Sequence, residues 1–204
     1  MPPKTRARKK RIFLLSPANL AGRRAEILLR QEAAFDLAVR VHAAGAPLGE
    51  IFSFVSGLYF RGKLAYATAF SQSDLAQKSI LIITATRGLL SPHVCVGHDD
   101  LSHMASVPIR CADARYRLPL ERDLARLARR IGRSAEVILL GSIATPKYLE
   151  PLSKIFGERL LVPAEFVGRG DMSRGALMLR AVRDRVPLTY APACSLSRAG
   201  PHLL

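Results

Sequence analysis

Cysteine is scarce in this chain, which limits how it can be cross-linked or bind a metal. The 204 residues include three cysteines, Cys95, Cys111 and Cys194. They are too few and too scattered for a disulfide framework or for a metal site built on closely spaced cysteine pairs. An iron–sulfur cluster is excluded as well, because it normally needs four thiolates. Such sparse use of cysteine is typical of an intracellular protein.

Long apolar runs are missing too. No stretch approaches the roughly 18 residues that a membrane span requires. The N-terminus lacks the apolar segment and the cleavage site of a secretory signal. We therefore expect a cytoplasmic protein with no membrane partner. Hydrophobic residues nevertheless make up 49% of the chain, and a chain of this length can bury a core without disulfides or metal.

Acidic residues are outnumbered by basic ones, 16 to 31, which gives a formal net charge of +15. Residues 1–11 are especially basic and are expected to form a disordered arm. The rest of the chain is also strongly basic, so we expect a polyanionic partner, of which nucleic acid is the commonest. The alternative is an arginine-rich genome, because most of the basic residues are arginine. A nucleic-acid partner would make the protein nucleoid-associated.

Short apolar runs alternate with helical patterns along the chain. Buried strands are expected at residues 12–15, 80–84, 137–140, 159–162 and 188–190. Helices are expected at 20–44, 60–70, 120–131, 147–156 and 173–185, while 48–55 fits either a helix or a strand. Residues 86–118 have the composition of a long loop, and 192–204 that of a loose tail. The pattern predicts one α/β domain over 12–191, with a three-layer arrangement and a mostly parallel central sheet of four to five strands covered by helices on both faces.

Ligands of open α/β sheets bind beyond the carboxyl ends of the strands, so the segments that follow each strand are candidate site segments. Ser16 to Asn19 follows the first strand, and Asn19 offers a donor and an acceptor at the tip of its turn. The alternative is that Asn19 or Ser16 caps the next helix. Thr84 and Thr86, at the end of the second strand, are further candidates for contacting a ligand.

Two aromatic residues lie among glycines and basic residues between 56 and 63. Tyr59 and Phe60 could stack on a base, while Arg61 and Lys63 could hold its phosphates. The alternative is that Phe60 belongs to the core. A further small-residue turn follows the third strand and begins a helix, a generic phosphate-binding arrangement. Its candidate residues, together with Ser16, are Ser142, Thr145 and Lys147.

The segment from Glu165 to Gly175 has the densest cluster of polar side chains. Glycines flank Arg169, whose guanidinium could fork onto a phosphate or a carbonyl. Asp171 and Ser173 are candidates for contacting the substrate, and Arg174 for contacting phosphate. Alternatively, Asp171 pairs with one of the two arginines and Ser173 caps the last helix.

Three histidines, His93, His98 and His103, lie near two aspartates but match no common metal-binding spacing. A solvated loop explains them better. The chain also lacks the G-x-S-x-G, P-loop and G-x-G-x-x-G motifs. We therefore expect neither a metal nor a cofactor.

The order of these segments resembles that of the uracil-DNA glycosylase superfamily. Residues 137–144 are similar to its late strand and Gly-Ser/Ala turn, and 159–174 stands where its DNA-wedging loop lies. Residues 16–19 stand at the place of its water-activating loop. Residues 57–60, Gly-Leu-Tyr-Phe, resemble its Gly-Leu-x-Phe segment, whose Phe stacks on uracil. The family's His-Pro-Ser loop is replaced by Gly-Arg-Gly-Asp-Met-Ser-Arg, and its Gly-x-x-Pro motif is absent.

The resemblance implies a monomeric DNA-repair enzyme that flips uracil out of DNA and hydrolyses its N-glycosidic bond. In that scheme Asn19 orients the attacking water, and Arg169 or the backbone near it stabilises the departing base. A neutral Asn is no general base, so slow turnover is expected.

A second family is also similar in short motifs. Residues 14–18, Leu-Leu-Ser-Pro-Ala, and residues 169–174 resemble two motifs of the YaaA peroxide-stress family. This resemblance implies a non-enzymatic DNA-binding protein, which needs a basic surface but no pocket. A tRNA-base-modifying enzyme is a third possibility, because a preference for deoxyribose or ribose cannot be read from the chain.

Overall fold

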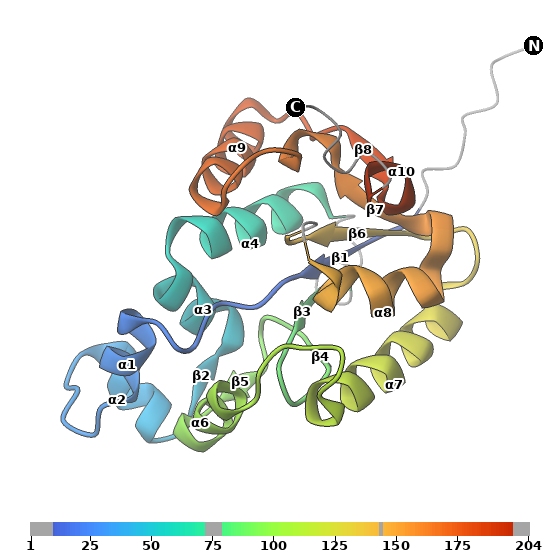
Figure 1. Cartoon of the computed structure of the whole chain (residues 1–204). Coiled ribbons are helices and arrows are strands. Elements are labelled where there is room, and N and C mark those ends of the chain that lie inside the picture. Colours follow the sequence, from blue (N-terminus) through green and yellow to red (C-terminus); the bar gives the residue numbers. More distant parts are fainter. Residues whose placement is uncertain (1–9, 72–78, 143–144, 198–204) are drawn as a thin grey trace, which may run out of the picture.

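The computed structural model describes residues 10–71, 79–142 and 145–197. Within them, six strands form one mixed sheet in the order β4-β3-β1-β6-β7-β8 (Figure 1). The four inner strands are mutually parallel, and the edge strands β4 and β8 pair antiparallel to their neighbours. The inner strands are β1 (Arg11–Leu15), β3 (Ile80–Ile83), β6 (Glu136–Leu140) and β7 (Leu160–Pro163). The edge strands are β4 (Leu89–Leu90) and β8 (Tyr190–Pro192).

Helices cover both faces of the sheet. Figure 1 shows α4 (Leu58–Phe70) and α9 (Asp171–Asp184) on one face, and α7 (Ala114–Ile131) and α8 (Pro146–Phe156) on the other. The α/β class is therefore confirmed. The expected four to five strands become six: β8 overlaps the strand expected at 188–190, and the short β4 is added at the other edge of the sheet. No helix of the described ranges is both long enough and apolar enough to span a membrane.

A smaller group of elements lies beyond the carboxyl ends of β1 and β6 (Figure 1). It contains the helices α1 (Arg23–Leu29), α2 (Asp36–His42), α3 (Leu48–Ser56) and α6 (His98–Ser106). Its two short strands, β2 (Ala46–Pro47) and β5 (Cys95–Val96), pair antiparallel with each other. The remaining short elements are η2 (Gly157–Arg159), η3 (Ala164–Phe166) and α10 (Ala193–Ser197).

Several sequence predictions are corrected by these elements. The single helix expected over 20–44 is two helices, because α1 and α2 each bury their own apolar face and the backbone between them turns extended at Arg30 and Phe35. The expected loop over 86–118 contains α6, two short strands and the beginning of α7. The ambiguous segment 48–55 is helical.

Both expected ends of the domain shift. Arg11 belongs to β1 rather than to the arm, and its guanidinium lies 3.3 Å from the carboxylate of Glu136. Pro192 ends β8, and α10 follows where a loose tail is expected. Residues 1–9 of the arm and 198–204 of the tail lie outside the described residues.

Helices α4 and α9 cross at two glycines. A Cβ atom at Gly175 would lie 2.9 Å from the carbonyl oxygen of Leu58 and 3.0 Å from Tyr59 Cα, and one at Gly62 would lie 2.8 Å from the carbonyl oxygen of Gly175. Because these neighbours are backbone atoms, a side chain could fit only if the helices moved apart. The crossing therefore fixes where α4 presents its side chains.

We expect Gly175→Ala to destabilise the fold. Overpacking typically costs about 1–3 kcal/mol, and alanine's higher helix propensity offsets roughly 1 kcal/mol of that cost. The matched control is Ala176→Ser, which adds one atom to the exposed face of the same helix and should stay within about 0.5 kcal/mol of the wild type. Urea unfolding measures both variants. A Gly175→Ala protein as stable as the wild type would contradict the close crossing.

Candidate functional site

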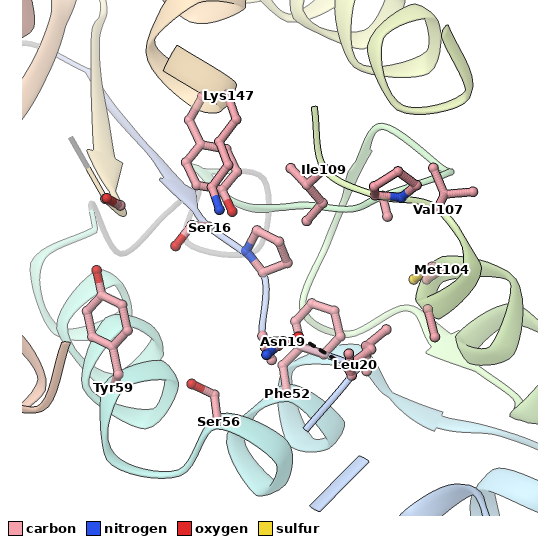
Figure 2. Close-up of a pocket in the computed structure, with 18 of the residues that line it drawn as sticks. Ser16, Asn19, Leu20, Phe52, Ser56, Tyr59, Met104, Val107, Ile109 and Lys147 are labelled. Carbon is pink, nitrogen blue, oxygen red and sulfur yellow. Dashed lines mark hydrogen bonds between the residues drawn. The ribbon is translucent and has the colours of Figure 1, made fainter. Parts of the chain in front are cut away.

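A pocket of about 660 Å³ opens at the carboxyl ends of the parallel strands (Figure 2). This volume lies in the roughly 300–1,000 Å³ range of small-molecule sites. The segments after three strands reach it: Ser16 to Ala21 after β1, Ala85 after β3 and Ser142 after β6. The corner between α3 and α4, the beginnings of α8 and α9, and the segment Met104 to Ile109 complete its wall.

The segment after β1 forms the floor and one rim of the pocket. The amide of Ser16 donates to the carbonyl oxygen of Leu140 (3.0 Å), which continues the pairing with β6 by one residue. Asn19 is exposed, and its Oδ1 accepts a hydrogen bond from the amide of Ala21 (3.0 Å; Figure 2). The alternative that Asn19 caps a helix is wrong, because α1 begins four residues later with Gly22 at its N-cap. Asn19 thus turns the chain locally at the rim.

Aromatic side chains form part of the wall. Phe52, Tyr59 and Tyr148 line the pocket from α3, α4 and α8. The hydroxyl of Tyr59 is buried and makes no hydrogen bond to any described residue. Burial, with a further contribution from Asp171, raises the pKa of Tyr59 to about 12. Burial also raises the pKa of Tyr148. Both phenols therefore stay neutral at pH 7, and their rings could pack against a planar ligand.

Lys63 is buried directly behind the floor of the pocket. Its side chain is 0% exposed, and its Nζ donates to the carbonyl oxygen (2.6 Å) and to the Oγ (2.8 Å) of Ser16. The Nζ also lies 4.4 Å from the centre of the Tyr59 ring and 4.9 Å from that of Phe60. The expectation that Lys63 reaches DNA phosphates at the surface is therefore wrong, because α9 and the sheet enclose that face of α4. Burial lowers the pKa of Lys63 to about 7, and the charge of Asp171 opposes this shift.

The segment that leads into α9 divides between the pocket and the surface. Asp171 lines the pocket, and its Oδ1 lies 3.5 Å from Arg174 Nη1, so the alternative pairing with an arginine is confirmed, while its contact with a ligand stays a prediction. Arg169 is exposed, does not line the pocket, and donates from Nη1 to Ser173 Oγ (3.1 Å). Gly170, not Ser173, is the N-cap of α9. Asp171 thus lines the pocket, whereas the Ser173 hydroxyl accepts a hydrogen bond from Arg169.

Arg174 is buried and stabilises the turn before α9. It is 6% exposed, and its Nε and Nη2 donate to the carbonyl oxygen of Phe166 at 3.2 and 3.1 Å. Its guanidinium also lies over the Phe166 ring, and its Nη1 is 3.5 Å from Asp171 Oδ1. The expectation of a phosphate contact is not met, because these bonds hold the turn before α9 and leave little of the group at the surface.

Five other candidates lie away from the pocket. Phe60 is core, with its ring edge-on to that of Phe52. Thr84 donates to the carbonyl oxygen of Gly88 (3.0 Å), so its hydroxyl closes a turn. Thr86, Arg61 and Thr145 do not line the pocket either; Arg61 lines a shallower hollow on the other side of α3, and Thr145 is the N-cap of α8 without a side-chain cap bond.

Ser142 and Lys147 do line the pocket, as the positions after β6 predict. Residues 143–144 between them lie outside the described residues. Sequence reasoning missed Phe52, Ser56, Tyr148 and the wall from Met104 to Ile109. Tyr148 could have been found, because it directly follows Lys147. No local signal marks the others, which depend on how α3 and α6 pack.

His98 and His103 lie in α6, where His98 stacks on His42 with ring centres 4.8 Å apart, and His93 lies between β4 and β5. In the part of the chain that the structure describes, no three His, Cys, Asp or Glu side chains are grouped as metal ligands would be.

No family model, curated protein or solved structure matches the chain.

Proposed function

We propose that the protein is a monofunctional uracil-DNA glycosylase that hydrolyses the bond between a flipped uracil and its deoxyribose. The observation that carries this proposal is the pocket: its volume of about 660 Å³ is large enough for a base, aromatic rings form part of its wall, and an amide, a carboxylate and a lysine line it. A protein that only binds DNA needs a basic surface and no such cavity. The charge of +15 supplies the attraction for DNA in either case.

The reaction breaks the bond between C1′ of the sugar and N1 of uracil, and both electrons leave with the base. Water adds to C1′, and its proton is transferred away. Positive charge develops on the sugar during this step, so a nearby carboxylate stabilises the transition state. Asp171 is the candidate: its side chain is 65% exposed, so a proton that it accepts can pass to solvent. Asn19, which also lines the pocket, would orient the water.

The departing base carries negative charge and needs hydrogen-bond donors. Backbone amides at the beginning of α9, near Asp171, are candidates, since a helix N-terminus favours an anion. The rings of Tyr59 and Tyr148 would stack on the base. Lys147 at the beginning of α8, with Ser142 before it, would hold the phosphate of the flipped nucleotide. Free uracil finally takes its proton from water.

The test is excision from end-labelled oligonucleotides that carry a single uracil, as single and double strands. The purified protein is incubated with each, and alkali then cleaves at any abasic site. We expect cleavage at uracil and none in a thymine control. Asn19→Ala should lose about 10²-fold or more in rate, as expected when a group that positions a reactant is removed. Tight, salt-sensitive binding without cleavage would instead favour a non-enzymatic DNA-binding protein.

The exposed position of Arg169 leads to a separate prediction. Because its guanidinium is exposed and does not line the pocket, we expect it to contact the DNA backbone. Arg169→Ala should weaken binding and lower the slope of log K against log salt by about 1, while the single-turnover rate at saturating protein stays the same. The matched control is Arg133→Ala, an exposed arginine near the amino end of β6. A lower single-turnover rate for Arg169→Ala would place this side chain at the reacting bond.

A further inference from the structure

Lys63 is a buried ammonium group that has no acidic hydrogen-bond partner among the described residues. Its two hydrogen bonds both go to Ser16, one to the carbonyl oxygen and one to Oγ. The face of the Tyr59 ring, 4.4 Å away, occupies a third side of the amine. The protonated form is thus matched on three sides by two oxygens and an aromatic face, which suits its three N–H bonds.

Ser16 connects this amine to the pocket. Its side chain lines the pocket floor, although the residue is 4% exposed. In Figure 2 its hydroxyl points toward the side of the pocket where Tyr59 lies. Because Ser16 Oγ accepts a hydrogen bond from Lys63, its own O–H is left to donate, and it donates to no described residue. A donor polarised by a buried cation therefore faces the cavity.

We propose that Lys63 and Ser16 form a relayed hydrogen-bond donor for the departing base, in which Lys63 positions the Ser16 hydroxyl and the hydroxyl donates to a base oxygen that gains negative charge as the glycosidic bond breaks. The inference rests on the proposed function and gives it a substrate class: bases with a keto oxygen at this position. Lys63 is a positioning residue, since Ser16 lies between it and the ligand. No covalent bond to either residue is involved.

The charges around Lys63 set the pH range in which this donor works. The carboxylate of Asp171, from α9, is the charged group that acts on the amine, and the phenol ring of Tyr59, from its own helix, lies 4.4 Å from the Nζ. Burial lowers the pKa of Lys63 to about 7, so the amine can lose its proton just above neutrality. A neutral amine polarises Ser16 less, whereas an anion in the pocket favours the ammonium form.

Excision rates across pH 6 to 9 test the relay. The wild-type single-turnover rate should fall above pH 7 with the loss of one proton. Ser16→Ala should be slower by about 10²-fold, which is typical when one such donor is removed. Lys63→Met should also be slower at pH 6, and its rate should no longer fall above pH 7. The matched control, Lys154→Met, removes an exposed lysine near the far end of α8 and should keep the wild-type profile.

A binding measurement keeps the relay testable even if a variant does not fold. NMR of lysine side chains follows the pKa of Lys63 in the wild-type protein, with and without millimolar free uracil. We expect uracil to raise this pKa. A rise without any excision would support the relay as a binding device and overturn the proposed reaction. Excision with unchanged rates and profiles in both variants would overturn the relay alone. Neither excision nor a rise would overturn both.

Discussion

Replacing Asp171 by asparagine is expected to slow uracil excision by about 10²–10⁴-fold, the usual loss when a group that accepts a proton in the transition state is removed. Asp171 is the carboxylate that lines the pocket, and asparagine keeps its size while removing its charge. DNA binding should persist or become tighter, because one negative charge near the phosphates disappears. Single-turnover rates and Kd values at fixed salt separate the two effects.

The matched control for this variant lies at the other end of the same helix. Asp184 ends α9 and pairs with its neighbour Arg183 (2.8 Å), far along the helix from the pocket. Asp184→Asn should leave the excision rate within twofold of the wild type. If Asp171→Asn excised uracil as fast as the wild type, Asp171 would have no part in the reaction, whatever the outcome for Asn19.

Lys63→Met is expected to stabilise the fold at pH 7 by about 1–3 kcal/mol, although it damages the site. The native pKa of Lys63, about 7, lies below its ordinary value of 10.5. At pH 7 this difference costs roughly 4 kcal/mol, at 1.36 kcal/mol for each pKa unit. The lost hydrogen bonds to Ser16 offset part of the gain. A buried charge that lowers stability is typical of a functional site.

The lowered pKa of Lys63 also predicts how the stability of the protein changes with pH. Between pH 7 and 10.5 the unfolded chain holds a proton on Lys63 that the native protein does not, so wild-type stability should rise with pH in this window. Below pH 7 both states are protonated and the cost is constant. Urea unfolding at pH 6 and pH 9 should show that the rise is lost in Lys63→Met and kept in Lys154→Met. Equal slopes in wild type and Lys63→Met would mean that the buried amine has an ordinary pKa.

The parallel core of the sheet was predictable because its strands are short apolar runs between turn residues. β1, β3, β6 and β7 all lie within two residues of their predicted positions. The two-residue strands β4 and β5 have no such pattern, since pairing defines them: β4 pairs with β3 across a short turn, and β5 pairs with β2, which is distant in the sequence. α6 was missed for a related reason: its polar sequence buries only Leu101 and Met104.

The candidate site was predictable where it depends on strand ends. Ser16, Asn19, Ser142 and Lys147 all meet at the pocket because the carboxyl ends of parallel strands converge at one edge of a sheet. Tyr59 and Asp171 also meet there. The opposite wall was not predictable, because it comes from helices whose positions depend on packing between distant segments.

The basic residues show most clearly what sequence alone does not contain. Lys63 and Arg61 are two positions apart in α4, yet one is buried and the other exposed. The close crossing at Gly62 and Gly175 decides which face of α4 is enclosed. Arg169 and Arg174 differ in the same way: Arg169 is exposed and Arg174 is buried. Only Arg174 is directed at the carbonyl oxygen of Phe166. The positive charge of these four side chains does not indicate which of them are buried.

Direct quantification of the released base tests the central claim. Duplex and single-stranded DNA with one uracil would be incubated with the wild-type protein, and free uracil measured by mass spectrometry beside the number of abasic sites. We predict equal amounts of free uracil and abasic sites, none from thymine DNA, and a loss in Asp171→Asn. DNA bound by the protein with no free base released would contradict a glycosylase and leave the pocket to another chemistry.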